Sequence, residues 1–171
     1  MTEKNPMREI KIEKVTLNIG VGEPGEELEK SKNLLEKLTE KTAKETQARK
    51  RSAFGVSQGR NIGVMVTLRN EEAEEFLEKA LEVKDGKIDR ENFTDNGNFS
   101  LGIEEHIDLP GAEYEPEIGI HGLDIAVTLI RPGYRIKKKK ISKPVGKSHK
   151  ITKEEAMEFV KDKFNVEITG D

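Results

Sequence analysis

The stretch Ile62-Gly-Val-Met-Val-Thr-Leu-Arg-Asn-Glu-Glu-Ala-Glu-Glu-Phe-Leu-Glu-Lys-Ala-Leu-Glu-Val83 changes its hydrophobic period from two to about 3.6. Apolar residues alternate with other residues from Ile62 to Leu68, which predicts a strand with one buried face. From Glu71 to Val83 the apolar residues recur at helical spacing on an acidic background, which predicts an amphipathic helix. A strand with one apolar face, followed by such a helix, is typical of a sheet covered by helices.

The same two periods recur elsewhere along the chain. Alternating or edge-like segments predict further strands over residues 9–19, 45–54, 99–103 and 123–129. The spacing leaves open an extension of the third of these strands through Ile107 and Leu109. Helical spacing predicts helices over residues 26–42 and 152–164. Thr152 and Glu155 form a capping box that marks the start of the last helix.

These elements define a fold class. Their order is strand, helix, two strands, helix, two strands, a long basic loop over residues 131–150 and a final helix. Strands with one polar face and connections of hairpin length favour a mainly antiparallel sheet with the helices packed on one face. We therefore predict a two-layer α+β domain whose other face is exposed for a ligand. A chain of 171 residues is long enough for one well-buried domain and short for two, so we expect a single domain over residues 1–171.

The formal net charge of -3 conceals a strong separation of charge along the chain. Nine of the 30 Lys and Arg residues lie between Arg131 and Lys150, a stretch without Asp or Glu. A second segment, from Lys41 to Arg69, carries seven basic residues and a single acidic residue. Because neither segment can neutralise its own charge, both favour a polyanionic partner.

Two features of the first basic segment favour RNA as that partner. Tyr134 and His149 place a stackable ring near either end, and the Gly and Pro residues bend the chain without adding bulk near phosphates. A solvated, flexible loop without a bound partner is the alternative interpretation of such a run of charge.

Composition and spacing argue against several function classes. The chain has no Cys, which excludes disulfides, thiolate nucleophiles and cysteine-bound zinc. Its three histidines, His106, His121 and His149, are far apart and lack the spacing of metal ligands. No Ser-His-Asp or paired-carboxylate site is visible, so we expect no metal, no cofactor and no enzymatic activity. Without an apolar leader or a stretch long enough to span a bilayer, we expect a cytoplasmic protein.

One motif points to a different class of protein. Gly20-Val-Gly-Glu-Pro-Gly25 lies between a predicted strand and a predicted helix, and it matches the GxGxxG pattern of dinucleotide-binding folds. In those folds the next strand is buried on both faces, whereas residues 44–52 are polar and basic. A tight strand-to-helix turn is therefore the favoured interpretation. A dinucleotide-dependent enzyme stays open as an alternative, as does a free-standing RNA chaperone that uses the basic loop.

Five segments, in order, resemble one family along nearly the whole chain. They are Lys14-Val-Thr-Leu-Asn-Ile-Gly-Val-Gly-Glu23, Gln47-Ala-Arg-Lys-Arg-Ser52, Ile62-Gly-Val-Met-Val-Thr-Leu-Arg69, the stretch 92–110 that begins Asn92-Phe-Thr-Asp-Asn-Gly-Asn-Phe, and Gly119-Ile-His-Gly-Leu-Asp-Ile125. In these residues the chain resembles the ribosomal protein L5 family, whose members bind 5S rRNA in the large subunit. Arg131-Pro-Gly133 and residues 147–157 indicate the archaeal and eukaryotic-type branch. The resemblance implies an antiparallel sheet with helices on one side and RNA on the other.

The resemblance also implies a function. It is that of a structural constituent of the large ribosomal subunit, which anchors 5S rRNA to the large-subunit rRNA. Asn18, Thr67 and Arg69 would face 5S rRNA from neighbouring strands. Residues expected nearby are Lys41, Thr46, Gln47, Arg49 and Lys50. Asn, Gln and Thr can hydrogen-bond RNA sugars and base edges, while Arg and Lys hold phosphates.

Two loops have further partners in the family. The first lies toward the peptidyl-site tRNA and a neighbouring large-subunit RNA helix, which implies contacts from Gly55, Ser57, Gln58, Gly59, Arg60 and Asn61. The second, around residues 108–119, resembles the arm that meets a basic small-subunit protein across the subunit bridge. Glu113, Glu115 and Glu117 give this loop the complementary charge. Other large-subunit proteins are expected as neighbours.

Bacterial members of the family lack the basic loop over residues 131–150. Its assignment to rRNA therefore depends on charge and on the placement of its rings alone. The residues expected to contact RNA are Arg131, Tyr134, Arg135, Lys137, Lys138, Lys139, Lys140, Lys143, Lys147, His149 and Lys150.

Overall fold

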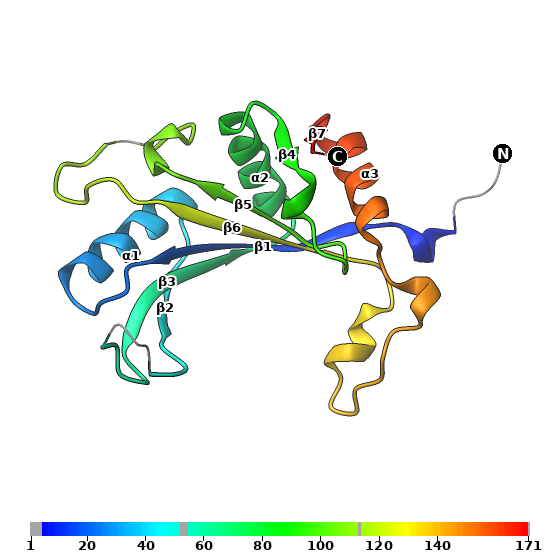
Figure 1. Cartoon of the computed structure of the whole chain (residues 1–171), viewed down its shortest axis with the longest axis horizontal. Coiled ribbons are helices and arrows are strands. Elements are labelled where there is room, and N and C mark those ends of the chain that lie inside the picture. The colour runs from blue at the N-terminus through cyan, green and yellow to red at the C-terminus, as the bar shows by residue number, and fades with distance from the viewer. Residues whose placement is uncertain (1–4, 52–54, 113, 171) are drawn as a thin grey trace. The chain divides into compact units, whose positions relative to one another are not determined.

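Three α-helices and seven strands make up the regular structure of residues 5–51, 55–112 and 114–170, the parts of the chain that the computed structural model describes (Figure 1). In chain order they are β1 (Lys11–Gly20), α1 (Glu26–Thr39), β2 (Lys44–Gln47), β3 (Asn61–Leu68), α2 (Glu71–Val83), β4 (Lys87–Asp89), β5 (Phe99–Ile103), β6 (Leu123–Ile130), α3 (Lys153–Phe164) and β7 (Glu167–Thr169). The predicted α+β class is confirmed, and each predicted strand and helix is present.

Five of the strands form one antiparallel sheet in the order β2-β3-β1-β6-β5. The edge position predicted for the polar segment that contains β2 is confirmed, although this strand ends at Gln47. β4 and β7 form a separate parallel pair in which Ile88 lies opposite Ile168. The sequence does not predict these two strands, because three residues are too few to show a period.

The chain divides into two compact units. The hairpin unit contains residues 16–68 and 101–125, and the terminal unit contains residues 1–15, 69–100 and 126–171. β1, β5 and β6 each contribute residues to both units.

The core of the hairpin unit forms where α1 packs on β3. Its buried side chains include Leu17 and Ile19 of β1, Leu28, Leu34 and Leu35 of α1, and Val64, Val66 and Leu68 of β3. α1 begins after Gly25, whose φ of +146° is accessible to glycine and strained for other residues. It ends before the predicted boundary at residue 42, because Glu40 adopts the left-handed conformation with a φ of 53°.

The helices of the terminal unit bury one side each. On α2 the buried residues are apolar residues of the predicted helical pattern, namely Ala73, Phe76, Leu77, Ala80 and Leu81. α3 buries Ala156 and Val160, whereas Phe159 and Phe164, which belong to the same apolar pattern, are only half-buried. α3 is therefore a more superficial helix than its sequence indicates.

The ends and contacts of α3 follow from its polar residues. The capping box is confirmed: the Glu155 amide donates to Thr152 Oγ1 at 3.3 Å, and the Thr152 amide donates to Glu155 Oε2 at 3.1 Å. The helix ends at Asn165, which takes the left-handed conformation. An ion pair between Lys163 and Glu74 links α3 to α2.

The strand that begins at Phe99 does not continue through Leu109. It ends at Ile103, and residues His106–Asp108 form a 3-10 turn. His106 and Leu109 are both buried and lie three residues apart, so the period of two is lost here. His106 Nδ1 accepts a hydrogen bond from the His121 amide at 3.2 Å, and burial lowers the pKa of His106.

Within the described residues, no helix combines the length and the apolar character needed to cross a membrane.

Candidate nucleic-acid interface

The hairpin unit has a polar surface on the side of its strands that faces away from the buried residues. On β1, Leu17 and Ile19 are buried while Thr16 and Asn18 are half-exposed. On β3, the neighbour of β1 in the sheet, Thr67 alternates with buried residues in the same way. Since successive side chains of a strand point to opposite faces, Asn18 and Thr67 lie on the side away from the core.

The pairing of β2 with β3 adds two side chains to this side. Thr46 lies opposite Gly63, and Lys44 lies opposite Met65. Residues directly opposite each other share a face of the sheet, so Lys44 and Thr46 lie on the side of Thr67. We call the surface formed by Thr16, Asn18, Lys44, Thr46, Met65 and Thr67 the open face.

Gly63 is a point of close approach within the open face. A Cβ atom at this position would lie 2.8 Å from the carbonyl oxygen of Ile19 and 3.0 Å from Thr46 Oγ1. Real Cβ atoms do not approach backbone oxygens that closely. Because Gly63 has no side chain, the Thr46 hydroxyl has space to lie over β3.

Glu45 points to the other side of β2. It lies opposite the buried Val64, and its carboxylate lies 3.5 Å from Lys32 Nζ of α1. Its other oxygen accepts a hydrogen bond from the Asn61 side chain. Glu45, the single acidic residue between Lys41 and Arg69, thus points toward α1 and away from the open face.

The cations expected near the open face lie on the connections around β2. Arg49 and Lys50 are exposed after the end of β2, and Lys41 is exposed before its start. Gln47, the last residue of β2, is also exposed. The backbone between these residues is fixed, because the Ala48 amide donates to the carbonyl oxygen of Arg60 at 2.8 Å. The cations therefore border a rigid strand.

The loop after residue 54 is polar and exposed. Gly55, Ser57, Gln58, Gly59 and Arg60 are all exposed, whereas Asn61 is half-buried and is held by Glu45. The Gly59 amide donates to the carbonyl oxygen of Ala48 at 2.9 Å, and Gly59 has a φ of +84°. This hydrogen bond closes the described part of the loop onto the end of β2.

Arg69 follows directly after β3 and belongs to the terminal unit. Its side chain is exposed, and one guanidinium nitrogen lies 3.4 Å from the carbonyl oxygen of Glu13 in β1. This interaction leaves most of the guanidinium donors available for another acceptor.

In the terminal unit, residues 131–150, called the basic tract below, form a loop with its two ends held together. Arg131 is 4% exposed and donates from Nε to the carbonyl oxygen of Arg8 at 3.0 Å. A second nitrogen donates to the carbonyl oxygen of Lys150 at 3.2 Å, and a third lies 2.8 Å from Glu155 Oε1. One guanidinium thus joins the N-terminal segment, the end of the tract and the start of α3.

The expectation that Arg131 contacts RNA is therefore corrected: the structure gives it a structural role. A buried guanidinium needs all its donors satisfied, and carbonyl oxygens and a carboxylate satisfy them here. The hydrogen bond and charge of Arg131 lower the pKa of Glu155, although burial of that carboxyl acts in the opposite direction.

The two rings of the basic tract also hold its two ends together. Tyr134 and His149 meet edge to face, with their ring centroids 5.8 Å apart. The Ile151 amide donates to the Tyr134 hydroxyl at 2.8 Å, and His149 Nε2 lies 2.9 Å from the carbonyl oxygen of Pro132. The sequence places these rings at opposite ends of the tract, and the fold brings them together.

The cations of the tract are mostly exposed. Its basic residues other than Arg131 lie at the surface, namely Arg135, Lys137, Lys138, Lys139, Lys140, Lys143, Lys147 and Lys150. Lys138 forms an ion pair with Glu13, and Lys137 Nζ lies 5.0 Å from the centroid of the Tyr134 ring. The tract thus receives one carboxylate from β1 and keeps a strong excess of positive charge.

The acidic loop expected at the bridge has one of its charges paired. Glu115 forms an ion pair with Lys37 of α1, with 2.7 Å between Lys37 Nζ and Glu115 Oε2. Glu117 is exposed. Glu113 lies outside the described residues.

The glycine-rich turn that resembles a dinucleotide motif is closed by backbone hydrogen bonds. The amides of Val21 and Gly22 both donate to the carbonyl oxygen of Ile62, at 2.9 and 2.8 Å. The first turn of α1 carries Glu26, Glu27 and Glu29, which oppose an anion at that helix end. Because the next strand, β2, is an antiparallel edge strand, the fold lacks the parallel arrangement of a dinucleotide site.

A polar sheet surface and a closed cationic loop are typical of proteins that bind a polyanion. The model for ribosomal protein L5 matches residues 5–56, and the model for the ribosomal L5 family C-terminus matches residues 61–159. The chain belongs to the ribosomal protein L5 family, which confirms the resemblance seen in the sequence and makes it a non-enzymatic ribosomal protein.

Three archaeal relatives illustrate the similarity. The large ribosomal subunit protein uL5 of Sulfurisphaera tokodaii is 50% identical over 167 residues, which cover 96% of this chain and 94% of that protein. Its counterpart in Sulfolobus acidocaldarius is 47% identical over 168 residues, covering 97% and 94%. That of Methanococcoides burtonii is 46% identical over 166 residues, covering 96% and 98%.

The structure adds Thr16, Lys44 and Met65 to the residues predicted for the open face. In the sequence Lys44 stands out only as part of a basic segment, although it is two residues from Thr46 and the period of two could have placed them together. Their positions follow from the strand pairing and from burial, which the sequence alone does not give.

Proposed function

We propose that this protein is a structural constituent of the large ribosomal subunit that binds 5S rRNA through the open face of its hairpin unit. The observation that carries the proposal is the alternation of β1 and β3, which presents Asn18 and Thr67 opposite a buried apolar core. Neutral polar groups on rigid strands can hydrogen-bond RNA sugars and base edges at fixed spacing. Family membership supports the assignment to the ribosome.

Exposed cations next to the ends of β2 and β3 supply the phosphate contacts. Arg49 and Lys50 are exposed beside β2, and Arg69 is exposed after β3. Phosphate contacts provide much of the affinity for RNA and make it dependent on salt. The logarithm of the association constant for 5S rRNA should fall by about 0.7 to 0.9 per logarithmic unit of salt for each phosphate neutralised.

Single substitutions test the assignment of the face. Asn18→Ala and Arg69→Ala should each weaken 5S rRNA binding by about 1–3 kcal/mol, because each removes a polar group that binds RNA. Asn33→Ala on α1 and Arg90→Ala, both at exposed positions, are the matched controls and should bind like the wild type. Gel-shift titrations at one salt concentration measure all four. Unchanged binding in both test variants would show that RNA lies elsewhere.

The loop of residues 55–61 is proposed to lie toward the peptidyl-site tRNA and large-subunit rRNA. Its exposed glycines and polar residues suit close approach to a sugar-phosphate backbone, with Arg60 as the cation. Replacing Arg60 with Gln should leave isolated 5S rRNA binding within about twofold of wild type, since this loop serves a different RNA. Chemical footprinting of tRNA on reconstituted ribosomes tests this interaction directly.

The loop of residues 108–119 is proposed to face a basic small-subunit protein. Support comes from the exposed Glu117, while Glu115 is shared with Lys37. A free-standing RNA chaperone would behave differently in a cell lysate. The protein should sediment with large subunits, and recovery only from the soluble fraction would favour the chaperone.

A further inference from the structure

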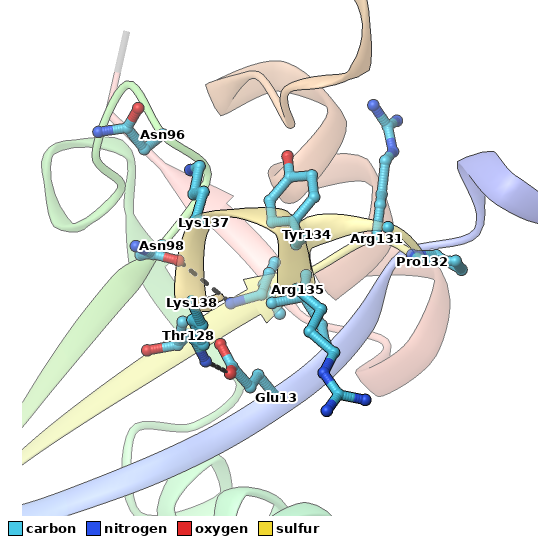
Figure 2. Close-up of a pocket in the computed structure, with 13 residues that line it drawn as sticks. Glu13, Asn96, Asn98, Thr128, Arg131, Pro132, Tyr134, Arg135, Lys137 and Lys138 are labelled. Carbon is cyan, nitrogen blue, oxygen red and sulfur yellow. Dashed lines mark hydrogen bonds and ion pairs between the residues drawn. The ribbon is translucent and has the colours of Figure 1, made fainter. Parts of the chain in front are cut away.

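A pocket at the base of the basic tract shares no residue with the open face or with the loops of residues 55–61 and 108–119. Tyr134, Arg135, Lys137 and Lys138, which the sequence predicts to contact rRNA, line it. It lies in the terminal unit and has a volume of about 430 Å³. Pockets that hold small ligands have volumes of roughly 300–1,000 Å³. Its lining comes from the end of β6, the turn before β5, Glu13 of β1 and the first residues of the tract, as Figure 2 shows.

Polar groups lie along one part of this pocket. Asn98 Oδ1 accepts a hydrogen bond from the Leu129 amide at 3.1 Å, which fixes the orientation of the Asn98 amide group. Thr128 and Asn96 add a hydroxyl and a second amide. Glu13 adds a carboxylate whose side chain is only 14% exposed. Donors and acceptors of hydrogen bonds are thus both present.

The part formed by the basic tract supplies a ring and positive charge. The Tyr134 ring is fixed by the hydrogen bonds of its hydroxyl group to the Ile151 amide and the His149 carbonyl oxygen. Lys137 lies over this ring, and Arg135 and Lys138 also line the pocket. In Figure 2 the Arg135 side chain extends away from the Tyr134 ring, and Arg135 is exposed.

These groups match the parts of one ribonucleotide. A base has a π-face for a tyrosine ring and an edge with N–H donors and acceptors, while its phosphate is an anion that Arg and Lys bind. An acidic peptide fits less well, because its carboxylates would engage the cations and leave the fixed Tyr134 ring without a planar partner. A metal cation fits less well, because four cationic side chains, Arg131, Arg135, Lys137 and Lys138, line the same pocket.

We propose that this pocket binds a single unstacked nucleotide of RNA, with its base beside Tyr134, its N–H groups toward Glu13 and its phosphate held by Arg135 and Lys137. The site is separate from the open face. It rests on the proposed function only in taking RNA as the partner.

A pair of substitutions at Thr128 tests whether the pocket is occupied. Thr128→Trp fills the pocket from a half-exposed strand position, where aromatic residues are well tolerated, and Thr128→Val keeps its shape. The probe is a fluorescein-labelled single-stranded RNA hexanucleotide, and its binding is followed by fluorescence anisotropy. The Trp variant should bind at least about fivefold more weakly, which corresponds to the loss of one stacked base, and the Val variant should bind like the wild type.

A second pair of substitutions distinguishes binding in the pocket from nonspecific attraction by the positive charge of the tract. Lys137 lines the pocket and Lys139 does not, so Lys137→Gln and Lys139→Gln remove the same charge from the same tract. The first should weaken hexanucleotide binding more than the second. Ultraviolet cross-linking followed by mass spectrometry should place a nucleotide on the peptide that contains Tyr134, and Thr128→Trp should remove this cross-link.

Three results would overturn the proposal. Equal effects of Lys137→Gln and Lys139→Gln, with wild-type binding by Thr128→Trp, would show that the tract acts through charge alone. Absence of hexanucleotide binding by the wild type would show that the pocket is not a nucleotide site. Displacement of the hexanucleotide by a polyglutamate peptide, sensitive to Thr128→Trp, would assign an acidic peptide instead. In each case the 5S rRNA affinities of Asn18→Ala and Arg69→Ala still test the proposed function separately.

Discussion

The open face of the hairpin unit and the basic tract of the terminal unit carry their chemistry in different ways. The open face consists of four neutral polar side chains, one lysine and one methionine on hydrogen-bonded strands, above a core that includes Leu17 and Val64 at 0% exposure. The basic tract is a loop of exposed cations whose two ends are held by Arg131 and by the Tyr134–His149 pair. The open face thus offers polar groups at fixed positions, and the basic tract offers a high density of positive charge.

This difference predicts different contributions to RNA binding. Groups fixed on strands keep their spacing, so they can distinguish one RNA shape from another. Cations on a loop add affinity for any phosphate backbone, and salt weakens that affinity. Substitutions in the open face should therefore change recognition, while substitutions of exposed lysines in the tract should change salt dependence.

The largest effect is expected where the basic tract is structural. Arg131→Met should lower the free energy of unfolding by about 3 kcal/mol, because it removes a buried ion pair and leaves carbonyl oxygens without donors. Arg135→Met, at an exposed position of the same tract, is the matched control and should change stability by less than about 0.5 kcal/mol. Urea denaturation measures both. Equal stabilities would show that the ends of the tract are not held as described.

The next effect concerns the shape of the open face. Gly63→Ala places a Cβ atom 2.8 Å from the carbonyl oxygen of Ile19, so the backbone or Thr46 must move. We expect a loss of about 1–3 kcal/mol in stability, with weaker 5S rRNA binding as a second consequence. Gly102→Ala on β5 meets no atom within 4 Å and is the control. Thermal denaturation of both variants decides whether the close approach at Gly63 matters.

A smaller effect is expected from the exposed lysines of the tract. Replacing Lys137, Lys138, Lys139 and Lys140 together with Gln should leave isolated 5S rRNA binding within about twofold of wild type, and it should weaken docking to the rest of the large subunit. The salt slope of that docking should fall by about 0.7 to 0.9 for each phosphate that the variant no longer neutralises. If the variant instead fails to bind isolated 5S rRNA, the basic tract, and not the open face, is the primary site for 5S rRNA.

The smallest effect is a pH dependence at the same loop. The folded-state pKa of Glu155 is lowered, first by its hydrogen bond with Arg131, so its ion pair stabilises the fold above the ordinary pKa of a glutamate. That stabilisation is lost as the pH falls from there through the lower folded-state value. Glu155→Gln should flatten the decline of stability with acid between those two values, measured by urea denaturation at several pH values. A decline as steep as in the wild type would show that Glu155 does not contribute to it.

The sequence predicts the long elements well because their periods are clear. β3, β6 and α2 begin and end within a residue or two of the alternating and helical patterns. β4 and β7 could not be predicted, because a three-residue strand shows no period and its pairing joins segments far apart in the chain. The end of β5 was obscured by His106, a polar residue that is buried by a turn.

The candidate interface was predicted less evenly than the fold. Asn18 and Thr67 lie on the side of their strands that the alternating pattern indicates. Arg131 was misassigned, because charge in a sequence does not show which cation finds buried acceptors. The pocket beside Tyr134 was not predicted, since it gathers residues from three stretches that lie far apart in the sequence.

The most direct test of the central claim compares 5S rRNA affinities of two double variants by filter binding at one salt concentration. The Asn18→Ala, Thr67→Val variant removes two polar groups of the open face, and the Lys139→Gln, Lys140→Gln variant removes two charges of the tract. If the open face is the primary site, the first binds about 30-fold more weakly than the wild type and the second stays within about twofold. Wild-type affinity in the first variant, together with a large loss in the second, would contradict it.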